Sequence, residues 1–388
     1  MNVFAIALIK PFILAGLQSE VMSKRLRSQI DEPLVKLIRE FREVVPLNIT
    51  SDYLIRRGFD EIKSIKELVQ NALDENEDVH GKPFVDLGRE PEGLVIGDRG
   101  RGFKPEYLLI GSSNKKCWMR GYYGEGLKLA ASYFTFHGYP VYIFSLGKVF
   151  KFVINDHAIS VLVGDAVERT EGTKILLYNY RNPEIGLDKL TSIYNEELKR
   201  DLIDTVYLSS KDCVAEKPAR IYGYPDKLFI RNIFVGSNSE VSKRKSFFSY
   251  DIWWVRLDVS RTLQSYSMPD VFREAARIFE KSAKARRLLA RKLIESDMAK
   301  RKEIDGKPYL AFSPIFATFE GHLFVYNFPR GILSDIVDEF GIEKENVRLI
   351  VGGASEEILK ELSNSGIVPF VIPTELAETR EFQVAPKR

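Results

Sequence analysis

Cysteine is scarce in this chain of 388 residues, which holds two cysteines and four histidines. Cys117 and Cys213 fit no zinc or redox spacing, and the histidines form no cluster with metal-ligand spacing. These shortages argue against a zinc-ribbon or dithiol redox protein. They favour a reducing, cytoplasmic location over the oxidising spaces where disulfide-built scaffolds occur.

A long hydrophobic run is also missing. A membrane-spanning helix needs about 20 consecutive apolar residues, whereas residues 1–18 are interrupted by Lys10 and Pro11. This stretch also lacks a basic leader region and a small-residue cleavage site. The sequence predicts no membrane span. We expect residues 1–18 to form an arm that packs on the fold or on a second subunit, with a true start at Met22 as the alternative.

An excess of charge of one sign is absent as well, because 57 basic and 54 acidic residues leave a net charge of +3. Such a balance permits a local basic surface without requiring a nucleic-acid partner. The 45% hydrophobic and 29% charged content is typical of a globular protein. The length exceeds one compact core, so we expect at least two domains.

The stretch SIKELVQNALDEN, residues 64–76, has helical periodicity and places Glu67 and Asn71 on one helix face, one turn apart. A carboxylate can accept a proton from water, and an amide oxygen can ligate a hard cation. Alone, such a pair is more typical of a solvated helix face. Its interpretation therefore depends on the motifs that follow.

Asp98 closes the apolar run GLVIGD and precedes Gly100 and Gly102. An acid at the end of a buried strand can accept a hydrogen bond from a ligand amino group, and the glycines let a flat ligand approach the backbone. A polar turn with a capping aspartate is the structural alternative.

The stretch RGYYGEGLKLAASYF contains Gly121, Gly124 and Gly126 directly before an apolar helix that begins near Leu127. Backbone amides of a glycine-rich loop at a helix N-terminus form an anion site, which suits phosphates. The Walker A pattern fails, because Lys128 is followed by no Ser or Thr, and the order of glycines does not fit the dinucleotide fingerprint. Lys128 itself could reach a phosphate or lie on the solvated side of its helix.

Four strands are predicted beyond this loop, within residues 139–180, and Gly172 and Thr173 open the last of them. A phosphate loop and helix inserted before several antiparallel strands favour an α+β sandwich over a doubly wound sheet.

Together the motifs resemble those of the GHKL ATPases, which include gyrase B subunits, ninety-kilodalton heat-shock chaperones, histidine kinases and MutL. The resemblance covers about residues 50–180. Its lid, GYYGEGLK, looks closest to those of MORC-like and type IIB topoisomerase-like members. The matching motifs are E-x-x-x-N-A-x-D at Glu67, Asn71, Ala72 and Asp74, D-x-G-x-G at Asp98, Gly100 and Gly102, G-x-x-G-x-G at Gly121, Gly124 and Gly126, and G-T at Gly172 and Thr173.

The resemblance implies a Bergerat-type site for Mg²⁺ and ATP. Asp98 would bind the adenine amino group, with Thr173 beside it, and Asn71 would hold Mg²⁺ on the phosphates. Glu67 would be the general base that activates water, which favours hydrolysis over phosphotransfer. The complete set of implied nucleotide-binding residues is Asn71, Asp74, Asp98, Gly100, Gly102, Gly121, Gly124, Gly126, Leu127, Lys128 and Thr173.

The remaining segments divide the chain into four predicted parts: an N-terminal arm and helix (1–48), the ATP-binding domain (49–182), a transducer-like α/β domain (183–330) and a small α/β unit with a tail (331–388). Helices are predicted over 23–45, over 182–208 and, as one long element, from Pro269 to beyond residue 296. A hairpin with Pro225 and Asp226 at its turn is predicted over 220–236. The basic stretch 281–302 could contact nucleic acid.

The leading functional hypothesis is a Mg²⁺-dependent ATPase that closes or dimerises on ATP binding and acts on a macromolecular client. The alternative is an interaction protein that binds ATP as a switch with negligible turnover.

Overall fold

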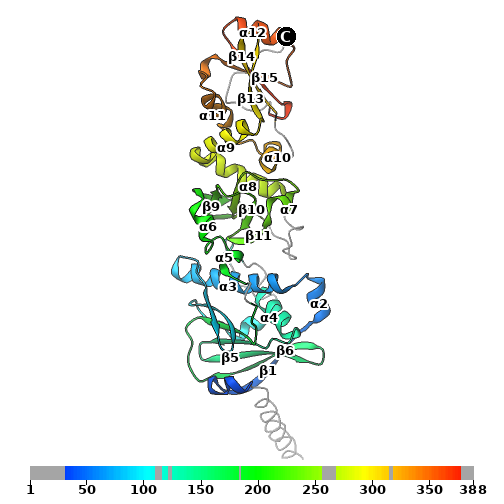
Figure 1. The fold of residues 1–388 in the computed structure, drawn as a ribbon. Helices are drawn as coiled ribbons and strands as arrows, with labels where there is room; N and C mark the ends of the chain where they lie inside the picture. The colour runs from blue at the N-terminus through cyan, green and yellow to red at the C-terminus, as the bar shows by residue number, and fades with distance from the viewer. Residues whose placement is uncertain are drawn as a thin grey trace, which may run out of the picture. The chain divides into compact units, whose positions relative to one another are not determined.

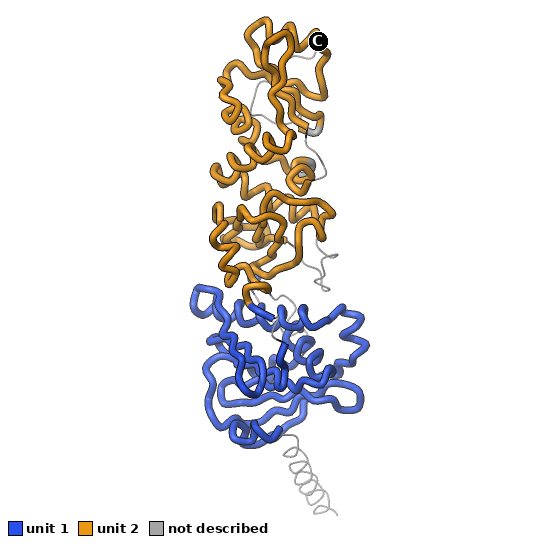
Figure 2. Tube along the Cα trace, in the orientation of Figure 1, with its two compact units in different colours: residues 1–186 blue, residues 187–388 orange. Residues whose placement is uncertain are grey.

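The computed structural model describes residues 31–109, 116–120, 125–182, 185–255, 268–313 and 318–376. The predicted arm, residues 1–18, lies outside these residues. The chain divides into two compact units, residues 1–186 and 187–388 (Figure 2). No helix in the described ranges is long and apolar enough to cross a membrane.

Unit 1 is a sandwich of one antiparallel sheet and a layer of helices. Its seven strands have the order β1-β6-β5-β4-β7-β3-β2. Helices α3 and α4 pack against each other on one face of the sheet (Figure 1). The elements are η1 (Glu32–Leu37), β1 (Ile38–Thr50), α2 (Ser51–Arg56), α3 (Glu61–His80), β2 (Asp86–Glu90), β3 (Gly93–Asp98), η2 (Pro105–Leu108), α4 (Gly126–Phe136), β4 (Val141–Ser145), β5 (Lys148–Asn155), β6 (Ala158–Ala166) and β7 (Thr173–Tyr178).

The helix predicted over residues 23–45 is wrong from residue 38 onward, because residues 38–45 belong to strand β1, whereas residues 32–37 form the short 3₁₀ helix η1. Ile38 and Phe41 are both buried although they stand three residues apart. The register with β6 shifts between Ile38 and Glu40 and again between Phe41 and Glu43. Each bulge adds a residue to one strand, so the apolar spacing of this bulged strand imitates that of a helix.

Unit 2 contains two further sheets. One has the order β11-β10-β12-β9-β8 and the other β13-β14-β16-β15, and a single apolar cluster includes residues from both. The elements are α5 (Leu187–Leu190), α6 (Glu196–Arg200), β8 (Leu202–Ser210), β9 (Cys213–Tyr222), β10 (Lys227–Ile230), β11 (Ile233–Ser237), α7 (Asn238–Ser242), β12 (Ser249–Ile252), α8 (Met268–Lys281), α9 (Ala283–Glu295), β13 (Ala299–Ile304), β14 (Lys307–Phe312), α10 (Phe319–Tyr326), α11 (Ile332–Glu339), η4 (Lys344–Asn346), β15 (Val347–Val351), α12 (Glu356–Asn364), β16 (Val368–Ile372) and η5 (Thr374–Leu376).

Three local predictions in unit 2 are wrong. The helix predicted over 182–208 ends in strand β8, which pairs with β9. The hairpin turn lies between β10 and β11 at Arg231 and Asn232, which both have the positive φ that such two-residue turns require. The long helix is broken at Ser282, whose side chain caps α9, and the basic residues near 300 belong to β13.

The predicted α+β class is confirmed: an α/β sandwich is followed by a second region of mixed helices and sheets. The α-β-α-β order predicted after residue 331 is also confirmed, as α11, β15, α12 and β16.

Candidate functional site

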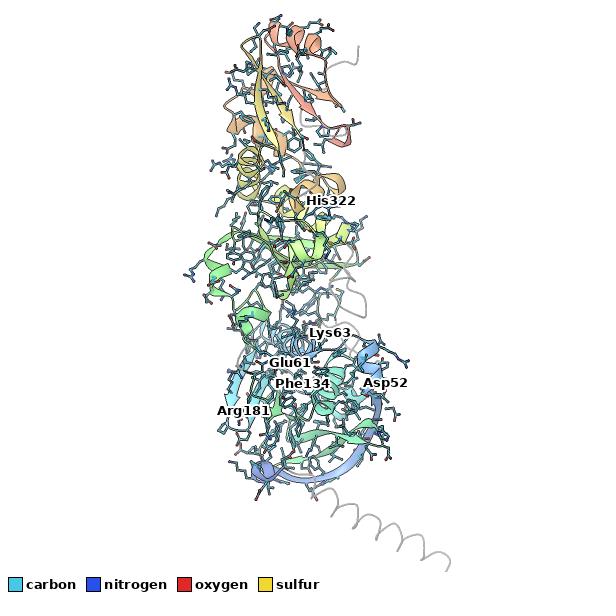
Figure 3. All side chains as sticks on the ribbon, turned by 45° about the vertical axis from the view of Figure 1, so that its right-hand side comes forward. Asp52, Glu61, Lys63, Phe134, Arg181 and His322 are labelled. Atoms are coloured by element: carbon cyan, nitrogen blue, oxygen red, sulfur yellow. The ribbon has the colours of Figure 1, made fainter. Side chains whose placement is uncertain are left out.

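Helix α3 carries several residues of the predicted site, and contacts on two sides hold its first turn in place. The Asp60 carboxylate caps the helix by accepting from the Lys63 amide at 2.7 Å. Glu61 accepts hydrogen bonds from the Tyr180 hydroxyl and from Asn182, just beyond β7. Figure 3 shows Glu61 and Lys63 in this first turn, with Phe134 of α4 nearby. The helix is thereby held against the end of β7.

Glu67 and Asn71 follow along α3. Glu67 is only 3% exposed, and Asn71 is half-buried. The Asn71 side-chain nitrogen donates to the Glu67 carbonyl at 2.7 Å. Because Nδ2 is engaged within the helix, Oδ1 is the Asn71 atom suited to ligate a cation.

Gly126, the first residue of α4, lies directly against the Glu67 carboxylate. A Cβ atom built on Gly126 would lie 1.9 Å from Glu67 Oε2. Within the part of the chain that the structure describes, no side-chain hydrogen bond caps this end of α4, and the N-terminus of a helix favours negative charge. The start of α4 is therefore a place where a carboxylate or a phosphate is stabilised.

Asp98 lies at the end of β3, paired with Thr173 at the start of β7. The Gly100 amide donates to Asp98 Oδ1 at 2.8 Å. Burial raises the pKa of Asp98 from its ordinary 3.8 to about 6; the nearby Glu75 adds to this, while hydrogen bonds from Gly100 and Thr173 oppose it. Asp98 is thus a desolvated carboxyl group that can still ionise at neutral pH.

The glycines around Asp98 permit close backbone contacts. Gly172 has φ +63°, and a Cβ there would lie 2.1 Å from the Asp98 carbonyl oxygen. Gly102 has φ +85°, and a Cβ there would meet Leu146 and Ser145. The Ser145 hydroxyl accepts from the Phe103 amide at 2.7 Å and donates to the Gly172 carbonyl at 2.5 Å. Ser145 therefore joins the D-x-G-x-G and G-T motifs.

Asp74, predicted to bind nucleotide, contacts Arg120, and its part in nucleotide binding stays a prediction. Its Oδ1 accepts from the Arg120 amide at 2.8 Å and from Arg120 Nη1 at 3.3 Å. Glu77 accepts from the same guanidinium at 2.7 Å, and both Asp74 and Arg120 are almost fully buried. Since Arg120 immediately precedes Gly121, this ion pair fixes the start of the predicted lid.

The lid itself can be placed only at its edges, because Gly121 and Gly124 lie outside the described residues. Leu127 is half-buried in the first turn of α4. Lys128 donates to the carbonyl oxygens of Tyr107 and Leu109, at 2.9 and 2.6 Å. Burial lowers the pKa of the Lys128 ammonium. The solvated alternative for Lys128 is therefore wrong, and its contact with a phosphate stays a prediction.

A metal ion at this site would depend on more than protein ligands. Among the residues that the structure describes, no group of three or more His, Cys, Asp or Glu could hold a metal. Mg²⁺ in nucleotide sites is commonly bound by one or two protein ligands together with phosphates and water. A single neutral oxygen from Asn71 fits that mode, so the residues present are compatible with Mg²⁺ delivered on a triphosphate.

Sequence reasoning missed three residues that shape the site: Asn76, Arg120 and Ser145. Each is buried and polar, and each binds backbone or acidic groups of the motifs. Asn76 could have been found from the sequence, since it lies on the same predicted helix as Glu67 and Asn71. Arg120 and Ser145 follow no motif, and their partners are 46 and 27 residues away.

A cavity of about 280 Å³ in unit 1 contains none of the predicted site residues. Its apolar lining includes Leu34, Phe144 and Leu176, which belong to the apolar cluster formed with η1 and β1. This cavity is therefore separate from the motifs along α3.

No protein family model matches the chain, and no curated protein matches it. Among solved structures, the chain is similar to a topoisomerase IV ATP-binding domain of Francisella tularensis, in complex with a small-molecule inhibitor, with 14% identity over 52% of this chain and 69% of that one and a TM-score of 0.29. It is also similar to the N-terminal domain of a DNA repair protein, with 12% identity over 48% of this chain and 82% of that one and a TM-score of 0.27. TM-scores this low do not establish a shared fold.

Proposed function

We propose that unit 1 binds Mg²⁺-ATP and hydrolyses it. The observation that carries this proposal is that α3, which carries one motif, has residues of the three other motifs beside it, although these are distant in sequence. Near residue 75 of α3 lie Gly100 and Asp98, with Thr173 paired to Asp98. Near residue 67 lies the start of α4. At 1.5 Å per residue these two regions are separated by about 12 Å along the helix, which suits a ligand with a base at one end and phosphates at the other.

Each residue has a role that its surroundings support. Asp98, when ionised, accepts a hydrogen bond from the adenine amino group, and Thr173 lies beside it. Asn71 Oδ1 ligates Mg²⁺, which neutralises phosphate charge when bound. The N-terminus of α4 stabilises the terminal phosphate. Glu67 orients a water molecule and accepts its proton, a role that depends mainly on positioning.

Turnover is tested by phosphate release from wild type and from Glu67→Ala, with nucleotide binding measured in parallel. We expect Glu67→Ala to retain ATP binding and to lose release by about 10²–10⁴-fold, the usual contribution of a general base. Equal rates in both proteins would refute the hydrolytic role of Glu67.

The burial of Glu67 against Gly126 favours a second candidate, in which ATP is a switch ligand. A carboxylate that is 3% exposed and packed on α4 cannot receive water until the two helices shift. ATP binding by wild type without measurable phosphate release would support this second function.

The partners remain part of the proposal: a cytoplasmic homodimer closed by ATP, with unit 2 relaying the change to a client such as nucleic acid. Three basic residues of α9 are paired with acids: Arg286 with Asp335, Arg291 with Glu339 and Lys292 with Glu295. Nucleic-acid contact in the basic stretch therefore depends mainly on its other exposed basic residues, which are Lys281, Lys284, Arg287, Arg301 and Lys302.

A further inference from the structure

Asn76, which no motif includes, is fully buried in α3 and connects three segments of unit 1. Its Nδ2 donates to the Phe84 carbonyl, just before β2, at 2.7 Å. Its Oδ1 accepts from the Arg99 amide, just after β3, at 2.8 Å. One side-chain amide thus ties both ends of the β2–β3 hairpin to the helix that carries Glu67 and Asn71.

Arg99 is held at further points. The His80 ring nitrogen lies 2.9 Å from the Arg99 carbonyl oxygen, and the Arg99 guanidinium donates to Asp86 at 2.9 Å. Both His80 and Asp86 are exposed, so their contacts are open to water and weak. Of the three residues that contact Arg99, Asn76 is the buried one. Its hydrogen bond is to the backbone amide directly after Asp98.

We propose that Asn76 is a positioning residue that sets where the Asp98 carboxyl group lies relative to α3, and thereby determines selectivity for adenine. The inference rests on the proposed function. A hydrogen bond to a ligand amino group requires the acceptor within about 3 Å and in line. Asp98 is the last residue of β3, whereas the proposed phosphate end of the site is built on α3 and α4. The distance between the two ends therefore depends on how residues 98–100 are held against α3. The Asn76 amide is a buried hydrogen-bonding contact that holds them there, whereas the nearby pair of Arg101 with Glu75 involves an exposed guanidinium.

The test compares ATP with inosine triphosphate, which has the same phosphates but a carbonyl in place of the adenine amino group. Binding of both nucleotides is measured for wild type, Asn76→Ala and Ser64→Ala. Ser64 is a matched control, because it is equally buried on the same helix and its hydroxyl donates to the Asp60 carbonyl at 2.6 Å, in the turn farthest from Asp98.

We expect Asn76→Ala to reduce the preference for ATP over inosine triphosphate at least tenfold, with the affinity for inosine triphosphate changed little. That loss corresponds to one hydrogen bond to a charged group. If Asn76 had a purely structural role, its replacement would weaken the binding of both nucleotides equally and leave the ratio of their affinities unchanged. We expect this result for Ser64→Ala. An unchanged ratio in Asn76→Ala would overturn the inference.

A second measurement does not require nucleotide. Amide hydrogen exchange at Arg99 should accelerate at least tenfold in Asn76→Ala, while exchange in the middle of β3 stays as in wild type. Unchanged exchange at Arg99 would also overturn the inference. If wild type binds neither nucleotide, the proposed function fails, and this second measurement still decides whether Asn76 fixes the loop. If wild type binds both nucleotides equally, the proposed function stands and the inference about adenine selectivity is overturned.

Discussion

Replacing Asp98 with asparagine should stabilise unit 1 at neutral pH while weakening its affinity for ATP. The folded protein holds the Asp98 proton up to about pH 6, whereas the ordinary carboxyl pKa is 3.8. Between these values the folded state binds more protons than the unfolded state, so the free energy of unfolding falls as pH rises. Above about pH 6 the folded protein bears the full cost of keeping the ionised Asp98 carboxylate buried. The difference between the two pKa values corresponds to roughly 3 kcal/mol of unfolding free energy.

Asparagine keeps the shape of aspartate and an oxygen that can accept from the Gly100 amide, but it carries no charge to desolvate. We therefore expect Asp98→Asn to raise the free energy of unfolding by about 1–3 kcal/mol at pH 8, and the gain to disappear below pH 4. The same change removes a charged acceptor and should weaken ATP binding about 10- to 100-fold.

Urea unfolding at pH 4, 6 and 8 measures this difference. Pulsed hydrogen exchange, read from peptides of unit 1, reports the unfolding of unit 1 separately from the unfolding of unit 2. Asp86→Asn is the matched control: Asp86 lies on the neighbouring strand, its side chain is 47% exposed, and it pairs with Arg99 at the surface, so we expect little dependence on pH. If Asp98→Asn is less stable than wild type at pH 8, the argument from burial is refuted. If ATP affinity is unchanged, adenine is recognised elsewhere.

Two further substitutions test other parts of the chain. Gly126→Ala places a methyl group on the Glu67 carboxylate and should abolish phosphate release. Gly88→Ala is the control, because its Cβ would meet nothing closer than 4.0 Å, and it should leave phosphate release unchanged. Equal phosphate release by both variants would show that Glu67 does not act from this position. Lys284→Glu combined with Arg287→Glu should abolish any salt-dependent retardation of DNA in a gel, with the fold preserved because both residues are exposed; undiminished retardation would exclude this surface.

The sequence predicted the elements that carry the site because their signals are local. The helix with Glu67 and Asn71 has regular periodicity, and the strand that ends in Asp98 is a continuous apolar run between turn residues. Residues 38–50 could not be predicted in the same way. Their bulges arise from pairing with β6, which lies more than 100 residues later.

Side-chain roles were less predictable than elements because they depend on partners distant in sequence. Lys128 is an ordinary surface residue by its type, yet α4 directs it to the carbonyl oxygens of Tyr107 and Leu109. Asp74 belongs to the motif that resembles the nucleotide site, and the motif gave no sign that its carboxylate binds Arg120, which lies 46 residues later. The break at Ser282 could have been predicted, since serine before a helical stretch is a strong N-cap signal.

Strand β1 limits where unit 1 could be cut from the chain. A fragment that starts at residue 49, the boundary predicted from sequence, would leave the edge of β6 without its hydrogen-bonding partner. It would also uncover the apolar surface now shielded by Leu34, Ile38 and Phe41, and an exposed strand edge beside an apolar face promotes aggregation. Lys151 and Tyr142 both bind the Asp31 carboxylate, so a soluble fragment should begin no later than residue 31.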